Sequence, residues 1–292
     1  MRPAASVIIP HHNDKDRLFL CLASLQRCSN RAEVEIIVVD NGQPSLDATF
    51  TKHHPDISFH YEPETGAAHA RNTGIRHAKG HILIFTDSDC QVAPDFLTQA
   101  LEAGAAHDVT GGRVRLTTQG VKLPNAIQAF EQVFAFNQRH YIEDKGFSVT
   151  ANLVTNIETL RAVGPFRAGL SEDYDWCQRA TALGYKLVYQ PDLIVSHPCR
   201  TSWGQLRSKW KRITAETYGV HRSRGGATAL WVAHALLMPF SIAAHAPRVM
   251  QSSALTTQSE RVGALTILAR LRLWRMVEMI RISLPHDPAE SG

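Results

Sequence analysis

The sequence predicts an α/β fold, with a mostly parallel central sheet flanked by helices and a helical C-terminal extension. In the first half of the chain, short runs of β-branched residues alternate with segments whose leucines and alanines recur at helical spacing. Beyond Arg200, strand-like runs give way to long basic and amphipathic segments. Apolar strands that alternate with helices are typical of a parallel sheet covered on both of its faces.

The first half of the chain supplies four strands and three helices. The strand-like runs are apolar, and the helical segments carry small or apolar residues on one face. Pro94 suits the first turn of the third helix, because the fixed φ of proline is compatible with that position. We expect strands at 6–10, 34–42, 57–62 and 81–87, and helices at 16–28, 66–79 and 94–101.

The second half extends the sheet and then becomes helical. In order, we expect a strand at 111–116, a helix at 125–140, a strand, turn and helix within 147–166, and a strand at 186–198. Helical segments then follow at 201–226, 229–245 and 262–284. The chain shows no internal repeat and no low-complexity linker.

Composition, cysteine usage and the N-terminus limit the class of protein. The 292 residues are 44% hydrophobic and 20% charged, which predicts a real core and argues against global disorder. A net charge of +4 is too mild to indicate nucleic-acid binding by itself. The five cysteines form no C-x-x-C pair, so neither a zinc site nor a disulfide framework is indicated. Because no apolar stretch of signal-peptide length opens the chain, we expect a cytoplasmic protein.

Three aspartates stand where predicted strands end. Asp40 ends the second strand, and Asp87 and Asp89 follow the fourth strand in "LIFTDSDC". Turn formation is one explanation, since Asp and Ser are common turn residues. Ligands of open α/β sheets, however, bind beyond the carboxyl ends of the strands. These carboxylates are therefore candidates for a ligand site.

Six motifs occur in an order that resembles the family 2 glycosyltransferases, which have the GT-A fold. The motifs are "IIPHHND", "VVDNG", "GAAHARNTGIRHAKG", "ILIFTDSDC", "SEDYDWCQRA" and "VSHPCR", and the resemblance covers roughly residues 5 to 205. It implies an inverting enzyme that moves a sugar from a nucleotide-diphosphate sugar, expected to be a UDP-sugar, to an acceptor hydroxyl. It also implies a divalent cation, Mn²⁺ or Mg²⁺, that neutralises the diphosphate.

On the donor side, the resemblance assigns a role to each candidate residue. Asp89 resembles the metal ligand of the Asp-x-Asp motif, and Asp87 resembles the residue that faces the ribose. His197 resembles a late histidine that completes the metal shell, which would favour Mn²⁺, or it is a polar histidine at a strand end. Arg71 resembles a charge-assisted donor to the nucleotide, or it forms a salt bridge on a helix surface. The other donor-side candidates are Pro10, Asn13, Asp40 for the base, Ser88, and Arg200 for the diphosphate.

On the acceptor side, Asp173 in "SEDYDWCQRA" resembles the catalytic base. An inverting transfer needs one carboxylate near the acceptor hydroxyl, and Glu172 is its neighbour. The alternative is a helix start that Ser171 caps, with acidic residues in the first turn, and the two interpretations are compatible. Asp175 shares a helix face with Glu172, and Arg179, one turn further, can pair with any of these three acids.

Two departures from the family pattern narrow the prediction. Many relatives have a tyrosine before the asparagine near the end of the first strand, where this chain has His12 before Asn13. Stacking on the donor base is therefore expected to differ. The segment "SWGQLRSKWKR" lacks the order of the motif that marks processive polymer synthases. We therefore expect the transfer of a single sugar.

Other classes of protein fit the sequence less well. A dinucleotide-dependent oxidoreductase needs glycines directly after the first strand, and "SVIIPHHND" has none. A nucleotidyltransferase that makes sugar nucleotides remains the alternative enzyme, although its Gly-rich basic loop is missing there too. A non-catalytic sugar-nucleotide-binding protein is the alternative outside enzymes, and it would be expected to lack Asp89 or Asp173.

The resemblance divides the chain into three parts. Residues 1–115 would bind the nucleotide sugar, 116–205 would form the acceptor side of the same domain, and 206–292 would form a basic, amphipathic tail. The basic residues at the start of the tail are Arg207, Lys209, Lys211, Arg212, Arg222 and Arg224.

The tail has two possible partners. In its last helix, we expect Val262, Leu265, Ala269, Leu273, Met276 and Ile280 on one face, and Arg270, Arg275, Glu278 and Arg281 on the other. This helix either lies on the inner face of the cell membrane or packs on the catalytic domain. Membrane contact would suit a lipid-linked acceptor in the assembly of cell-surface polysaccharide or glycolipid.

Overall fold

The computed structural model describes residues 2–118, 120–121, 123–169, 171–223 and 225–284. They form two compact units. The first, which we call the sheet unit, comprises residues 1–117 and 137–198, and the second, the helical unit, comprises 118–136 and 199–292. The division therefore falls at other places than the expected boundaries at 115 and 205. Of the predicted tail, Arg224 and residues 285–292 lie outside the described residues.

The sheet unit is built on an eight-stranded sheet of order β3-β2-β1-β4-β7-β6-β8-β5. β3, β2, β1 and β4 run parallel, whereas β7 is antiparallel to both of its neighbours. β8 is parallel to β6 and antiparallel to β5. The strands are β1 (Ala5–His11), β2 (Val34–Asn41), β3 (Ile57–Glu62), β4 (Ile82–Thr86), β5 (Gln91–Val92), β6 (Val109–Thr117), β7 (Asn152–Asn156) and β8 (Leu187–Pro198).

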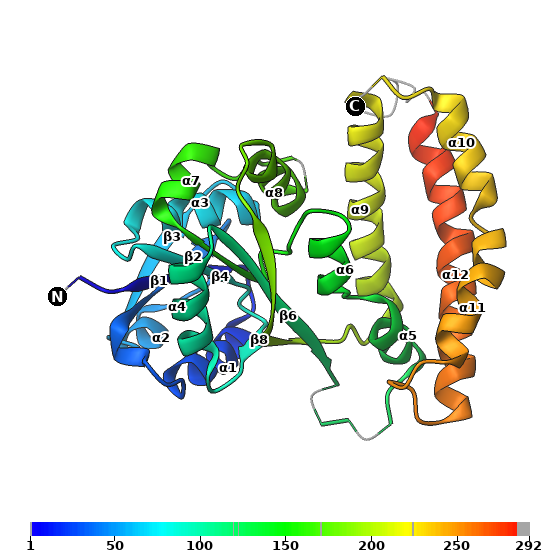
Figure 1. Ribbon diagram of the computed structural model, residues 1–292. Helices are drawn as coiled ribbons and strands as arrows, with labels where there is room; N and C mark the ends of the chain where they lie inside the picture. Colours follow the sequence, from blue (N-terminus) through cyan, green and yellow to red (C-terminus); the bar gives the residue numbers. More distant parts are fainter. Residues whose placement is uncertain (1, 119, 122, 170, 224, 285–292) are drawn as a thin grey trace. The chain divides into compact units, whose positions relative to one another are not determined.

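Helices cover both faces of this sheet. Figure 1 shows α3, α7 and α8 on one face and α1 and α4 on the other. On the first face, Phe85 of β4 packs against Phe166 and the fully buried Trp176. The helices of this unit are α1 (Lys15–Gln26), η1 (Arg31–Glu33), α2 (Ala48–Lys52), α3 (Ala67–His77), α4 (Phe96–Ala106), α6 (Gln138–Glu143), α7 (Ile157–Val163) and α8 (Glu172–Ala182).

Gly80 explains why the small-residue helix is followed by "AKG". A Cβ atom at Gly80 would lie 2.4 Å from the carbonyl carbon of Ala5. Only glycine allows the chain to pass this close to β1 on its way into β4. The close approach places β4 beside β1, so the carboxyl ends of both strands share one edge of the sheet.

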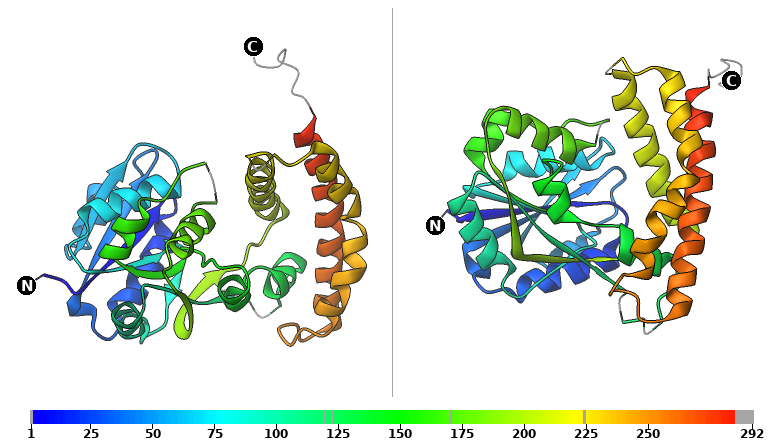
Figure 2. Two further views of the ribbon diagram at one scale, coloured as in Figure 1. Left: turned by 45° about the horizontal axis from the view of Figure 1, so that its top comes forward. Right: turned by 45° about the vertical axis from the view of Figure 1, so that its right-hand side comes forward.

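The helical unit packs four of its helices around a fifth, α12. Figures 1 and 2 show α10 and α11 end to end along α12, and both helices contact it. Its core joins Phe130 of α5, Leu206 of α9 and Leu268 of α12. The helices are α5 (Ala126–Phe134), α9 (Trp203–Ser223), α10 (Thr228–Leu237), α11 (Phe240–Met250) and α12 (Gln258–Ser283).

Three expectations about these elements were wrong. The helix expected at 125–140 is broken into α5 and α6, because the side chain of Asn137 accepts a hydrogen bond from the amide of His140 and starts a new helix. α4 begins at Phe96, so Pro94 precedes the helix. The residues expected on the apolar face of α12 include Val262 and Leu273, which are exposed. The buried stripe runs instead through Ala264, Ile267, Leu268, Leu271 and Met279.

Among the described helices, no single helix is both long enough and apolar enough to cross a lipid bilayer. α10 and α11 meet those criteria only when they are taken together, and they meet at a bend of 49°.

Candidate active site

Most of the candidate residues of the sheet unit lie at one edge of the sheet. In the parallel register His11 pairs with Asp40, so β1 and β2 end side by side. β4 ends at Thr86, and Asp87, Ser88 and Asp89 therefore continue from the same edge. Pro10 lies half-buried within β1, and Asn13, with a φ of 51°, turns the chain from β1 into α1. Asparagine tolerates this left-handed conformation better than most residues.

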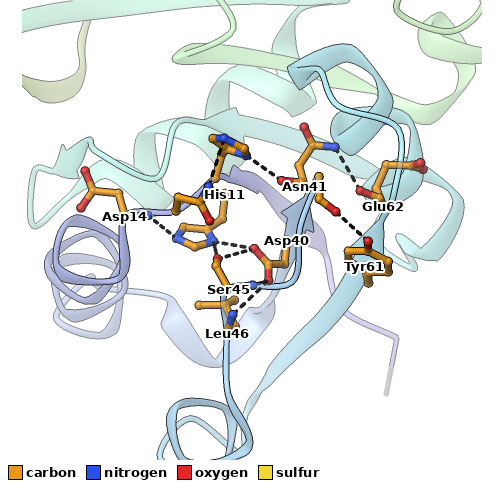
Figure 3. A network of polar contacts seen from close by, with 11 residues as sticks. His11, Asp14, Asp40, Asn41, Ser45, Leu46, Tyr61 and Glu62 are labelled. Atoms are coloured by element: carbon orange, nitrogen blue, oxygen red, sulfur yellow. Dashed lines mark hydrogen bonds and ion pairs between the residues drawn. The ribbon is translucent and has the colours of Figure 1, made fainter.

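Asp40 organises the loop that follows β2 (Figure 3). One carboxylate oxygen accepts hydrogen bonds from His11 Nδ1 at 2.9 Å and Ser45 Oγ at 2.8 Å. The other accepts from the amides of Ser45 at 2.6 Å and Leu46 at 3.0 Å. Burial opposes ionisation, but these hydrogen bonds outweigh it and hold the pKa of Asp40 below its usual value. Both oxygens are thus engaged within the chain, and base recognition by Asp40 stays a prediction.

His11 is held in one tautomer by this network. Its Nε2 accepts a hydrogen bond from the amide of Asp14 at 3.1 Å, so the proton resides on Nδ1 and is donated to Asp40. The geometry of the loop therefore does not need a charged imidazole.

Asn41, which lies within the motif "VVDNG" but is not among the predicted site residues, is a structural residue of the site. Its side-chain amide donates to the carbonyls of Glu62 at 3.2 Å and Glu64 at 2.7 Å. Its side-chain oxygen accepts from the amide of Gly66 at 2.7 Å. A buried amide satisfied in this way fixes the entry to α3, the helix that carries Arg71. An asparagine directly after a strand-end aspartate was the available signal.

Arg71 joins the two acidic motifs. Its guanidinium donates to Asp87 at 2.8 Å and to Glu172 at 2.9 Å, and only 4% of its side chain is exposed. Burial disfavours the charged form, but the two carboxylates outweigh it and raise the pKa of Arg71. Arg71 is buried between carboxylates instead of lying on a helix surface, and its role as a donor to the nucleotide stays a prediction. The sequence could not show it, since Asp87 and Glu172 are distant in the chain.

Asp173 lies at the start of α8 with a perturbed pKa. Burial, followed by the neighbouring charge of Glu172, raises the pKa of Asp173, although Ser171 and Tyr174 donate hydrogen bonds to it. Ser171 makes no side-chain cap to the helix and donates instead to Asp173 at 3.0 Å. Ser171 thus occupies the N-cap position before an acidic first turn, as the capping alternative predicts, but its side chain does not make the capping hydrogen bond. A partly buried carboxylate with a raised pKa can accept a proton near neutral pH.

Asp175 and Arg179 hold α8 in place against the end of α7. Arg179 donates to Asp175 at 2.9 Å, one helical turn away, and not to Glu172 or Asp173. The same guanidinium also donates to the carbonyls of Val163 and Pro165. These bonds fix the start of α8 against the end of α7, so Arg179 positions the acidic motif.

Asp89 lies between β4 and β5 and faces His197 on β8, the strand that pairs with β5. His197 Nδ1 donates to the carbonyl of Pro198 at 2.8 Å, which leaves Nε2 directed at Asp89, 3.4 Å away. A backbone carbonyl on the far nitrogen is the usual way in which proteins orient a metal-binding histidine. A carboxylate oxygen and an imidazole nitrogen at this spacing fit a divalent cation such as Mn²⁺.

These residues alone make an incomplete coordination sphere. Among the described residues, no group of three or more His, Cys, Asp or Glu side chains is arranged to hold a metal ion. A cation at Asp89 and His197 would therefore need ligands from a bound phosphate or from water, as in sites where Mg²⁺ is shared with a substrate. Ser88 lies half-buried between Asp87 and Asp89.

Arg200 lies in the helical unit and is held by a buried glutamate. Its backbone amide and its guanidinium both donate to Glu131, at 2.7 and 2.8 Å. Lys209 approaches the same carboxylate at 3.5 Å. The two cations outweigh burial and lower the pKa of Glu131. Contact between Arg200 and a diphosphate stays a prediction.

Comparison with known sequences identifies relatives over most of the chain. The model of the family described as "Glycosyl transferase family 2" matches residues 6–174. Glycosyltransferase AglE of Haloferax volcanii is 33% identical over 226 residues, which cover 72% of this chain and 72% of AglE.

Comparison with solved structures shows the fold. The mannosyltransferase PcManGT from Pyrobaculum calidifontis, in complex with GDP-Man and Mn²⁺, matches 96% of this chain and 86% of its own, with a TM-score of 0.58 and 20% identity. GalNAc-T7 with UDP, GalNAc and Mn²⁺ matches 73% of this chain and 48% of its own, with a TM-score of 0.54 and 17% identity. The expected GT-A fold is confirmed.

Proposed function

The chain belongs to glycosyl transferase family 2, and we propose that it is an inverting, metal-dependent enzyme that transfers a single sugar from a nucleotide-diphosphate sugar. The observation that carries this proposal is the bridge formed by Arg71. It holds Asp87 of the Asp-Ser-Asp motif against Glu172, the neighbour of Asp173. The two motifs that we assign to the donor and the acceptor are thus each within hydrogen-bond distance of the same guanidinium.

Asp89 and His197 would hold the divalent cation, together with the donor diphosphate. When bound, the cation would neutralise charge on the leaving nucleoside diphosphate. The carboxylate–imidazole pair supports this assignment, as do structural neighbours crystallised with Mn²⁺. Pro10, Asn13, Ser88 and Asp87 would border the nucleotide. We keep a UDP-sugar as the expected donor, although PcManGT was crystallised with GDP-Man.

Asp173 would act as the general base. As the acceptor hydroxyl oxygen attacks the anomeric carbon, its proton passes to the carboxylate of Asp173. The bond from that carbon to the diphosphate oxygen breaks, and the nucleoside diphosphate leaves with the bonding electrons. The raised pKa of Asp173 makes its carboxylate a better proton acceptor than an exposed aspartate.

We further propose a setting for the reaction. The enzyme would work in the cytoplasm on the inner face of the cell membrane, with a lipid-linked acceptor in the assembly of surface polysaccharide or glycolipid. The basic composition of residues 199–284 supports contact with anionic lipid.

A substitution of Asp89 tests the metal assignment. Asp89→Asn keeps the shape of the side chain but weakens its hold on a cation, so we expect at least a hundredfold loss of Mn²⁺-dependent UDP-sugar binding, measured by calorimetry. Asp192→Asn, which removes an exposed carboxylate from β8, is the control and should bind like the unmodified chain. A panel of UDP- and GDP-sugars, assayed for transfer and hydrolysis, would identify the donor. Full activity in the presence of EDTA would show that the metal assignment is wrong.

A further inference from the structure

The outer side of α10 and α11 exposes several large apolar side chains. Leu230 is 68% exposed to solvent and Phe240 is 74% exposed, and Leu236 and Leu237 are exposed as well. We call these four residues the α10–α11 outer face. The opposite side of α10 is buried, where Trp231 packs near Met279 and donates a hydrogen bond to its carbonyl. A soluble monomer rarely gathers this many large apolar side chains on one exposed helical surface without a partner.

The segment that carries this face is basic. In the sequence, residues 217–259 contain no aspartate or glutamate, whereas arginines occur at 222, 224 and 248. Arg248 is exposed on α11 and lies over the ring of Phe134 at 5.1 Å. An apolar centre with basic flanks complements an anionic lipid surface. It disfavours a second copy of the same chain, because two such faces would repel each other.

A pocket adjoins the face. It lies between α9 and α10, has a volume of about 370 Å³, and is lined by Thr217, Val220, Leu230, Trp231 and two histidines. Leu230 belongs to both the pocket and the outer face, so the two are continuous. Pockets of this size and apolar character accept small apolar ligands.

Two arginines of α12 lie over tryptophan rings of α9. Arg270 lies over the ring of Trp203 at 4.1 Å, and Arg275 lies over Trp210 at 4.3 Å. Burial lowers the pKa of Arg275 to about 10. Both side chains stabilise the packing of α9 on α12. Arg275 is partly buried and poorly placed to reach lipid headgroups, whereas Arg270 is exposed. The α10–α11 outer face adds a second, more apolar candidate for the lipid contact that the sequence suggested for α12.

We propose that the α10–α11 outer face docks on an anionic lipid bilayer and that the adjoining pocket takes up one acyl chain. Leu230, Leu237 and Phe240 enter the acyl layer, and Arg222 and Arg248 meet the headgroups. The proposal rests on the membrane setting proposed above. It does not alter the chemistry at Asp89 and Asp173, which a soluble acceptor or donor hydrolysis can report separately.

Vesicle flotation of the full chain tests the docking surface. We expect the chain to float with vesicles of equal parts phosphatidylglycerol and phosphatidylcholine at low salt, and not with phosphatidylcholine alone. The double substitution Leu237→Gln and Phe240→Gln should lower the bound fraction at least tenfold. Leu183→Gln, which changes a comparably exposed leucine in the sheet unit, should leave flotation unchanged. Donor hydrolysis should be retained in all of these proteins.

Several results would overturn the docking surface. One is flotation of the double variant like the unmodified chain, and another is no flotation of the unmodified chain with anionic vesicles. A third is sedimentation of the chain as a dimer that the double variant dissociates, because a second copy would then cover the face.

A second pair of variants tests the pocket. Thr217→Phe adds a ring to the pocket from an exposed position, and Ala215→Phe adds the same ring to α9 outside the pocket lining. Phosphatidylglycerol with brominated acyl chains should quench tryptophan fluorescence in the unmodified chain and in the Ala215 variant, through Trp231. We expect that quenching to fall at least twofold in the Thr217 variant while flotation persists. Equal quenching in both variants would show that no chain enters the pocket.

Discussion

In the described part of the chain, two ionic triads that have an almost fully buried central group show opposite arrangements of charge. In the sheet unit a cation, Arg71, lies between two acids, Asp87 and Glu172. In the helical unit an acid, Glu131, lies between two cations, Arg200 and Lys209. The central group is almost fully buried in both, and the flanking groups are more exposed.

The two triads differ in the segments to which their flanking residues belong. Asp87 and Glu172 belong to the two motifs that we assign to donor and acceptor, and Glu172 raises the pKa of Asp173. Arg200 and Lys209 join the start of α9 to α5 within the helical unit. A buried ionic triad is therefore not by itself a sign of catalysis. The acidic triad suggests function because its surplus negative charge borders a candidate base and a candidate cation site.

The largest effect should come from the base beside the acidic triad. Asp173→Asn keeps the size of the side chain but cannot accept a proton, so we expect the transfer rate to fall by about 10²–10⁴. UDP-sugar binding and the thermal midpoint should change little. In the unmodified chain, the raised pKa of Asp173 should place the acidic limb of the pH–rate profile at a higher pH than an unperturbed aspartate would. A variant that loses donor binding and stability together with rate would assign Asp173 to the fold instead.

Removing the centre of each triad compares the two directly. Arg71→Met leaves two acids without their cation, and Glu131→Gln leaves two cations without their acid. Each change should cost about 3 kcal/mol of unfolding free energy in urea denaturation, because it leaves unpaired charge in a buried site.

Only the change in the acidic triad should move the pH–rate profile. Arg71 lowers the pKa of Asp173, so its loss should shift the acidic limb to higher pH. Glu131→Gln should leave the limb where it is. Identical limbs in both variants would contradict the distinction between the two triads.

The smallest effect concerns the contribution of Lys209 to stability, and we expect it only at alkaline pH. Burial lowers its pKa from 10.5 to about 8 in the folded chain. Between those values the unfolded chain holds a proton that the folded chain lacks, so this group makes stability rise with pH. Cys177 and Cys199 act in the opposite direction, because burial raises their pKa to about 12. The contribution of Lys209 is therefore measured as the difference in unfolding free energy between the unmodified chain and Lys209→Met. We expect this difference to change in the stated direction when both are unfolded in urea at pH values from 7 to 10.

The sequence predicted the sheet better than the partners of its side chains. β3 has the predicted bounds and β1 begins and ends within one residue of its prediction, because buried β-branched runs bounded by polar turns admit few alternatives. The strand-end position of Asp87 and Asp89 followed from the same pattern. The pairing of Arg71 with Glu172 could not be predicted from the sequence, because it depends on where α8 packs against the rest of the unit.

The helical unit was harder to predict for a different physical reason. α12 carries apolar residues on several sides, and Val262, Leu273 and Val277 are exposed, so periodicity does not single out the buried stripe. Arg275 lies partly buried on Trp210, a position that a charge pattern alone would assign to solvent. Where a helix carries apolar residues on several sides, the elements that pack against it decide which side is buried.

The position of β8 has a consequence for how the chain matures. β8 enters the sheet between β6 and β5, and it is the last strand in the described part of the chain. A nascent chain that has not yet emerged beyond residue 198 therefore exposes the edge of β6 and leaves β5 without its partner strand. His197 arrives on that same strand. Synthesis of β8 thus covers the open edge of β6 and supplies the second proposed cation ligand in one event. A chain that terminates before β8 would therefore lose both the cover of that edge and the proposed ligand.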